Sequence, residues 1–88
     1  MISKNYIIMA PEGIHARPAT TLIRLTKKFK SVVSLKKGDN LIRLNSMLNI
    51  LALGAKGGDA VSVIIEGEDE AEAAAAIDVF FAEELKNL

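Results

Sequence analysis

The feature that most restricts the fold of this chain is a short turn, Gly38-Asp39, between a β-rich segment in which Val33 and Leu35 share one face and a second short segment rich in apolar residues. The first segment covers residues 31–36 and the second covers residues 41–44. Glycine readily adopts the positive φ that tight turns need, and the short separation favours a hairpin. We therefore expect these two segments to pair as antiparallel neighbours.

The remainder of the chain predicts two more strands and three helices around this hairpin. Apolar residues alternate over residues 2–9 and 61–65, as in strands with one buried face. The predicted order is β-α-β-β-α-β-α, which indicates an α+β fold with three helices on one face of a four-stranded antiparallel sheet. The first predicted helix runs from about residue 16 to Lys28. The second has Ser46 as its N-cap and stops at Gly54. The last begins at the acidic residues 68–70, whose charge suits a helix start.

The two longer helices each carry an apolar stripe that we expect to face the sheet. The expected stripe of the first helix is Ala19, Leu22, Leu25 or Thr26, and Phe29, and that of the last helix is Ala73, Ile77, Phe80 or Phe81, and Leu85.

The start of the first helix holds the only histidine of the chain, His15. Pro18 has a fixed φ and needs no amide partner, so it suits the first turn and places His15 at or next to the N-cap. Unpaired backbone N–H groups and the positive end of the helix dipole favour an anion there. Arg17 adds a planar set of donors that can pair with phosphate oxygens. These neighbours predict phosphate chemistry, although a lone histidine at a helix start is more commonly a surface or capping residue.

Composition predicts a single domain over residues 1–88. Half of the residues are hydrophobic and a quarter are charged, as in small globular proteins. The absence of cysteine excludes disulfides and thiolate chemistry, and a single histidine with dispersed carboxylates offers no metal site. No segment approaches the ~18 apolar residues of a membrane span, and the N-terminus lacks a signal-peptide pattern. A cytoplasmic location without direct membrane insertion is expected.

Charge is strongly segregated although the formal net charge is zero. Residues 1–56 carry ten Lys or Arg and two acidic residues, whereas residues 57–88 carry one Lys or Arg and nine acidic residues. Arg17, Arg24 and Lys27 share one helical face, which is either a solvated surface or a surface that steers an acidic protein toward His15. Nucleic-acid binding is not expected, because the few aromatic residues fall in apolar patterns and the charges balance.

Two segments carry a resemblance to a known family. Gly13-Ile14-His15-Ala16-Arg17-Pro18-Ala19 resembles the active-site motif of the HPr family, the histidine phosphocarriers of the bacterial sugar phosphotransferase system. Residues 45–54 resemble the regulatory-serine region of that family at the matching distance, and the resemblance covers essentially the whole chain. It implies the open-faced β-sandwich of HPr.

The resemblance also implies a function. His15 accepts a phosphoryl group on Nδ1 from phosphorylated enzyme I, whose own donor is phosphoenolpyruvate, and passes it to sugar-specific enzyme IIA domains. Arg17 and the backbone N–H of Ala16 are expected to stabilise the phosphoryl oxygens. The chain would serve as a carrier rather than an independent enzyme, with no metal or organic cofactor.

Regulation and docking are implied by the same resemblance. Ser46 is expected to be phosphorylated, with HPr kinase/phosphorylase and catabolite control protein A as further partners, although serine is also among the best N-cap residues. Exposed apolar residues of the Ser46 helix and basic residues of the first helix would meet phosphoryl donors and acceptors. The expected partner surface is Thr20, Arg24, Lys27, Met47, Leu48, Leu51 and Gly54.

Two other classes of function remain open. One is a regulatory protein of an incomplete phosphotransferase system, acting through Ser46 and a transcription factor. The other is a small interaction module in which His15 is only a cap. Glu12 departs from the family pattern, because small or polar residues are common there and a carboxylate could repel the phosphoryl group. We expect its side chain to point away from His15.

Overall fold

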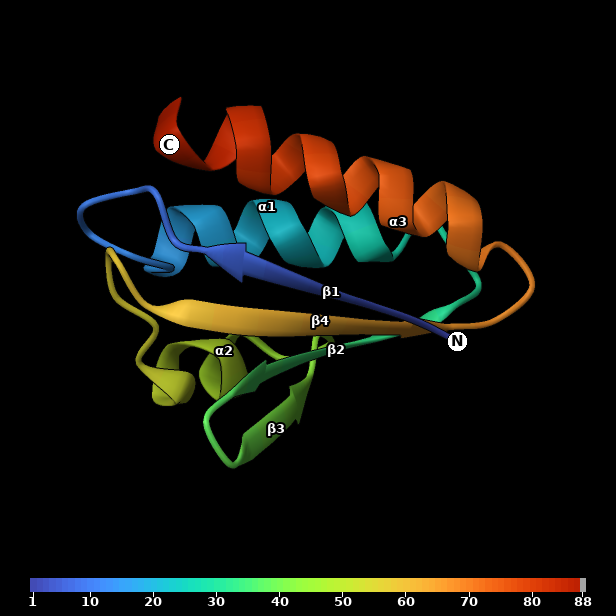
Figure 1. The fold of residues 1–88 in the computed structure, drawn as a ribbon, viewed down its shortest axis with the longest axis horizontal. Coiled ribbons are helices and arrows are strands. Elements are labelled where there is room, and N and C mark those ends of the chain that lie inside the picture. The colour runs from blue at the N-terminus through green and yellow to red at the C-terminus, as the bar shows by residue number, and fades with distance from the viewer. Residues whose placement is uncertain (88) are drawn as a thin grey trace.

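The computed structural model describes residues 1–87 and shows an open antiparallel sheet with helices on one face (Figure 1). The element order confirms the predicted α+β arrangement. Within the described residues the strands are β1 (Ile2–Ile7), β2 (Val32–Lys37), β3 (Asn40–Arg43) and β4 (Ala60–Glu66). The α-helices are α1 (Ala16–Thr26), α2 (Met47–Leu53) and α3 (Glu70–Val79), and α3 continues into a π-helical turn (Phe80–Glu84) and a 3₁₀ turn (Leu85–Asn87).

The strands lie in the order β1-β4-β2-β3, and every neighbouring pair is antiparallel. The predicted hairpin is confirmed, since β2 and β3 pair around Gly38, whose φ is 60°. Leu35 of β2 lies opposite both Val63 of β4 and Ile42 of β3. Val33 and Leu35 of β2 and Val61, Val63 and Ile65 of β4 are buried, as the period of two predicts.

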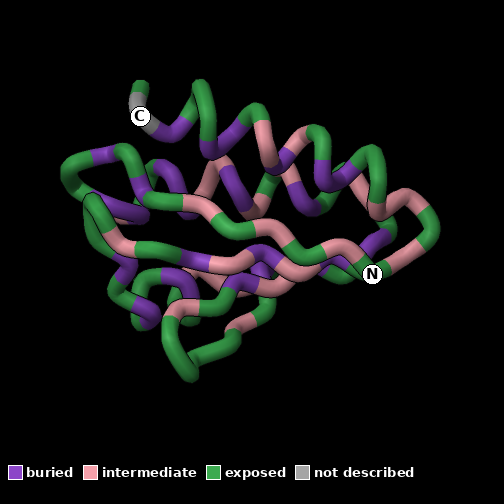
Figure 2. Tube along the Cα trace, in the orientation of Figure 1, coloured by how far each residue is buried: buried purple, intermediate pink, exposed green. Residues whose placement is uncertain are grey.

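The core lies between the sheet and the helices, as the distribution of buried residues in Figure 2 shows. α1 and α3 contact each other above the sheet, and α2 packs against α1 and β3. Ala19 and Leu22 of α1 and Ala73 and Ile77 of α3 are almost fully buried. The predicted stripes are thus confirmed in their main members, although Phe29 is only half-buried.

Both candidate phenylalanines are buried, and both lie in the π-helical turn. The N–H of Leu85 bonds to the carbonyl of Phe80, which adds one residue to the turn. Phe80 and Phe81 pack edge to face with ring centroids 5.2 Å apart, and Phe81 stacks on Tyr6 at 4.4 Å.

Two predicted boundaries were too long. The first strand ends at Ile7 rather than Met9, because the ladder with β4 ends at the pair Ile7–Ala60. Beyond it, Ile8 bonds to the turn before β4: its N–H donates to the carbonyl of Asp59 at 2.9 Å, and its carbonyl accepts from the N–H of Gly58 at 2.8 Å. The first helix ends at Thr26 rather than Lys28, because the N–H of Lys28 bonds to the carbonyl three residues earlier, closing a tighter turn. Among residues 1–87, no helix is long and apolar enough to span a bilayer.

Candidate functional site

His15 is the N-cap residue of α1, as predicted. Its backbone is extended (φ −93°, ψ −165°), its side chain makes no capping hydrogen bond, and 37% of that side chain is exposed. The N–H of Ala19 bonds to the carbonyl of His15 at 3.0 Å, and Pro18 has no N–H. The amides of Ala16 and Arg17 are therefore the first-turn donors that remain for an anion next to the imidazole.

The loop that carries His15 is tied to the segment after α2. The N–H of Ile14 bonds to the carbonyl of Ala55 at 3.0 Å, and Ile14 itself is buried. Gly13 has a φ of 71° and lies so close to Ala55 that an added Cβ would be 2.1 Å from the Ala55 carbonyl oxygen. Two backbone contacts thus fix the position from which α1 begins, and with it the position of the histidine.

Glu12 does not point away from His15, so that expectation is wrong. Its Oε2 lies 3.3 Å from Nε2 of the imidazole, although 79% of the Glu12 side chain is exposed. The positive φ of Gly13 reverses the chain between the two residues and brings their side chains to the same side. The spacing of three residues was the available signal, but the turn between them could not be read from it.

Arg17 lies on the exposed side of the first turn of α1. Within residues 1–87 its guanidinium forms no ion pair with a carboxylate, so its donors remain available for a bound anion. Thr20, one turn later, donates its hydroxyl to the carbonyl of Ala16 at 2.9 Å and is half-buried. The further predicted basic residues, Arg24 and Lys27, are exposed on the same helix.

Ser46 caps α2, which confirms the structural part of its prediction. Its hydroxyl oxygen accepts a long hydrogen bond, 3.4 Å, from the N–H of Asn49. At the other end Gly54 has a left-handed backbone (φ 67°), and its carbonyl accepts a hydrogen bond from Nζ of Lys37 at 2.9 Å. Lys37 also pairs with Asp59 at 3.1 Å, and the Lys56 backbone N–H together with Lys37 lowers the pKa of that carboxyl.

The predicted apolar part of the partner surface is largely exposed. Leu48 is 79% exposed and Leu51 is 39% exposed, whereas Met47 is half-buried and packs on the core. α2 contacts α1, and Ala55, directly after Gly54, bonds to the histidine loop. The structure therefore brings the basic helix, the apolar helix and the histidine loop together on neighbouring elements.

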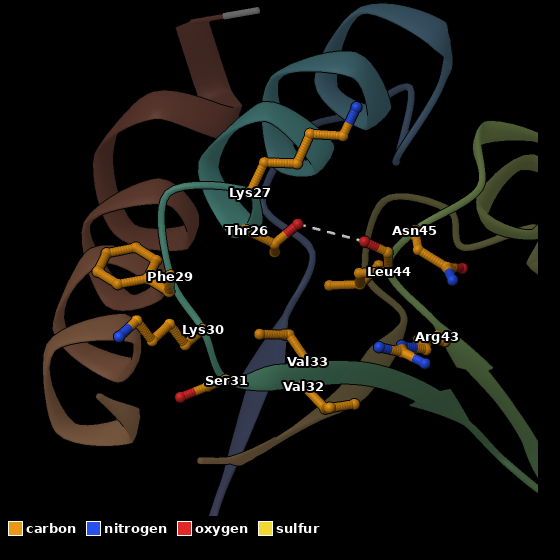
Figure 3. A pocket seen from close by; sticks show the side chains of 10 residues that line it. All are labelled: Thr26, Lys27, Phe29, Lys30, Ser31, Val32, Val33, Arg43, Leu44 and Asn45. Carbon is orange, nitrogen blue, oxygen red and sulfur yellow. Dashed lines mark hydrogen bonds between the residues drawn. The ribbon is translucent and has the colours of Figure 1, made fainter. Parts of the chain in front are cut away.

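A pocket lies at the end of α1 far from His15 (Figure 3), and Lys27 of the predicted partner surface is among its lining residues. α1 has 11 residues, which places its two ends about 16 Å apart at 1.5 Å per residue. The hydroxyl of Thr26 donates to the carbonyl of Leu44 at 3.2 Å in the pocket wall, and the side chains of Lys27 and Lys30 extend in different directions. The pocket is lined by Thr26, Lys27, Phe29, Lys30, Ser31, Val32, Val33, Arg43, Leu44 and Asn45.

Taken together, the open sheet and the exposed histidine at the start of α1 define a histidine-bearing α+β protein of the open-faced β-sandwich type. A family model for the phosphorylation site of the HPr component of the phosphotransferase system matches residues 2–83. The chain belongs to this family.

Solved structures agree with this assignment. A histidine-containing phosphocarrier protein of Mycoplasma matches with a TM-score of 0.89 and 27% identity, over 96% of each chain. The HPr-C-His protein of Thermoanaerobacter tengcongensis matches with a TM-score of 0.88 and 30% identity, over 100% of this chain and 98% of its own. Crh, a catabolite repression protein of Bacillus subtilis that forms a swapped dimer, matches with a TM-score of 0.76 and 28% identity, over 97% of this chain and 98% of its own. Family and neighbours support a phosphocarrier role in the phosphotransferase system.

Proposed function

We propose that this chain accepts a phosphoryl group on Nδ1 of His15 from phosphorylated enzyme I and passes it to enzyme IIA domains. The observation that carries the proposal is His15 itself, which caps α1 with an exposed imidazole and no capping hydrogen bond, inside the matched family region. Within this proposal, residues 1–88 act as a single cytoplasmic carrier domain rather than as an independent enzyme.

The chemistry needs a nucleophile and compensation for negative charge. The lone pair of the ring nitrogen attacks phosphorus, a P–N bond forms, and the bond between phosphorus and the donor atom breaks with its electron pair leaving on the donor. Phosphoryl transfer depends mainly on positioning and electrostatic stabilisation. The amide N–H groups of Ala16 and Arg17 and the Arg17 guanidinium are the groups we assign to the phosphoryl oxygens.

Docking, in this proposal, uses the exposed residues of α1 and α2. An apolar centre at Leu48 and Leu51 with basic residues beside it suits a complex that forms and dissociates quickly. Arg24 and Lys27 supply positive charge for acidic partners. The half-buried Met47, together with Thr20 and Gly54, completes the surface assigned to the donor and to the acceptors.

Incubation with enzyme I and radiolabelled phosphoenolpyruvate tests the transfer. The chain should acquire acid-labile label, and His15→Ala should acquire none while remaining folded. Absence of label on the wild-type chain, or label that persists in His15→Ala, contradicts the proposal. Addition of an enzyme IIA domain should then remove the label from the carrier.

Ser46 favours a second, regulatory activity, because similarity to Crh extends over nearly the whole chain. Phosphorylation by HPr kinase/phosphorylase would add about two negative charges at the start of α2, close to the surface assigned to acidic partners. Incubation with ATP and this kinase should give acid-stable label that Ser46→Ala lacks. The modified chain should accept phosphoryl groups from enzyme I more slowly and should bind catabolite control protein A. Presence of His15 separates this chain from a regulator that cannot relay phosphate.

A further inference from the structure

We propose that Glu12 is a positioning residue for phosphoryl transfer: its carboxylate holds a proton on Nε2 of His15, so that Nδ1 carries the reactive lone pair. This inference rests on the proposed phosphocarrier function and adds a residue to its machinery. It also reverses the expectation that a carboxylate at this position only hinders the reaction.

The first support is the contact itself. Oε2 of Glu12 lies 3.3 Å from Nε2 of His15. Among the described residues, Glu12 provides the carboxylate that pairs with the imidazole ring. A neutral imidazole has one protonated and one unprotonated nitrogen, and its environment decides which is which. A negative charge beside Nε2 favours the tautomer with the proton on Nε2 and leaves the lone pair on Nδ1.

The second support is that the backbone fixes both residues. The N–H of Gly13 bonds to the carbonyl of Ala10 at 2.9 Å, and the N–H of Ile14 bonds to the carbonyl of Ala55 at 3.0 Å. His15 is held in turn as the N-cap of α1. The turn therefore keeps the two side chains on the same side even though both are accessible to solvent, and a donor protein can still approach the ring.

The same contact balances charge during the reaction. When the Nδ1 lone pair forms its bond to phosphorus, Nε2 keeps its proton and the ring becomes positively charged. The Glu12 carboxylate compensates this charge without receiving the proton, in the way that a buried aspartate stabilises imidazolium in serine proteases. When the phosphoryl group leaves, the bonding pair returns to Nδ1 and the ring is again neutral with its proton on Nε2.

Repulsion between Glu12 and the phosphoryl group acts in the opposite direction. Coulomb energy falls with distance, and the ring separates Glu12 from a phosphoryl group on Nδ1. The phosphoryl charge is also assigned to Arg17 and the α1 amides, whereas the carboxylate lies directly against Nε2. We therefore expect attraction to the ring to exceed repulsion, with a modest net effect because Glu12 is exposed.

Two measurements on Glu12→Gln test this inference, with Glu72→Gln as the control. Glu72 is an exposed carboxylate on α3. Its replacement removes the same single negative charge as Glu12→Gln, but on an element other than the histidine loop. Nitrogen-15 NMR of labelled imidazole, at a pH where the ring is neutral, reports which nitrogen carries the proton. Single-turnover transfer from phosphorylated enzyme I reports the rate of acceptance.

For the wild type and Glu72→Gln we expect an imidazole protonated mainly on Nε2. In Glu12→Gln the two nitrogen shifts should move toward each other, since a glutamine amide can either donate or accept. Its transfer rate should fall about 2- to 5-fold, the scale of an exposed ion pair. Unchanged nitrogen shifts, or a transfer rate equal to or above wild type, overturn the inference. A wild-type chain that accepts no phosphoryl group contradicts the proposed function instead, and the nitrogen spectra alone then decide whether Glu12 controls the ring proton.

Discussion

At the scale of single residues, Gly13 controls where His15 lies. It combines a φ of 71° with backbone contact, because an added Cβ would be 2.1 Å from the carbonyl oxygen of Ala55 and 2.6 Å from the Cα of Lys56. We expect Gly13→Ala to lower the free energy of unfolding by roughly 2–5 kcal/mol, from left-handed strain together with overpacking. Urea denaturation followed by circular dichroism measures this loss.

Gly38→Ala is the matched control for this prediction. Gly38 has a similar φ of 60°, but no atom lies within 4 Å of the position its Cβ would take. It should therefore show the left-handed strain alone, about 1–2 kcal/mol. If the two variants lose equal stability, steric contact with Ala55 does not restrict the histidine loop, and the close approach is relieved by a small shift of the chain.

At the scale of secondary-structure elements, Asp69 joins the start of α3 to the segment between α1 and β2. Its carboxylate accepts hydrogen bonds from the backbone N–H groups of Lys30 and Ser31, at 2.8 and 2.9 Å, and from the Ser31 hydroxyl at 2.5 Å. These bonds, the Ser31 hydroxyl foremost, hold the pKa of Asp69 below its ordinary value. The carboxylate form is therefore the one that stabilises the fold.

This lowered pKa gives the acid dependence a definite sign. The contribution of Asp69 to stability is complete above the ordinary pKa of an aspartate, about 4, and disappears as pH falls through the lower folded value. Asp69→Asn should be less stable than wild type at pH 7, and the difference in urea midpoint should shrink as the pH falls from about 4 toward 2. Glu68→Gln, which loses only an exposed 3.7 Å contact with Lys30, should match wild type at pH 7. A pH-independent difference for Asp69→Asn would contradict this account.

The start of α2 has a cap that we expect to be weak. Because the bond from Asn49 to Ser46 is 3.4 Å long, Ser46→Ala should lower the free energy of unfolding by about 0.5–1 kcal/mol, at the low end of capping effects. Ser46→Asp should stay close to wild type, since aspartate also caps and its charge suits a helix start. Urea denaturation of both variants, beside the exposed strand variant Ser3→Ala, checks this ranking.

Most of these elements could be predicted from local pattern, whereas their connections could not. Alternation, Pro18 and the Gly38 turn indicate the type and order of the elements because each depends on neighbouring residues. The bonds from Ser31 to Asp69 join residues 38 positions apart, and no local pattern predicts such partners. The same limit applies to Glu12: its spacing from His15 was visible, but its direction depends on the left-handed Gly13, which is held against Ala55 by tertiary structure.

At the scale of the whole molecule, the separation of charge along the sequence is only partly kept in space. Lys4 pairs with Asp78 and Lys37 with Asp59, and Glu84 lines a hollow together with Arg24 and Lys28. The basic residues Arg17, Arg24 and Lys27 are exposed on α1, whereas the acidic residues Glu72, Glu83 and Glu84 are exposed on α3 and its extension. With a formal net charge of zero, attraction of a partner depends on which face it meets rather than on the total charge. A negatively charged donor should therefore be oriented as well as attracted.

The rate of phosphoryl acceptance should accordingly depend on salt through α1. Lys27→Gln should lower the second-order rate constant several-fold at about 0.01 M ionic strength, where the screening length is ~30 Å, and much less near 0.15 M, where it is ~8 Å. Lys36→Gln is the control, because Lys36 is exposed on β2 next to the inward-facing Leu35 and so points to the sheet face opposite the helices. Stopped-flow transfer from phosphorylated enzyme I at several salt concentrations measures both. If the two variants show the same salt dependence, the donor responds to total charge, and the basic face of α1 is an ordinary solvated surface.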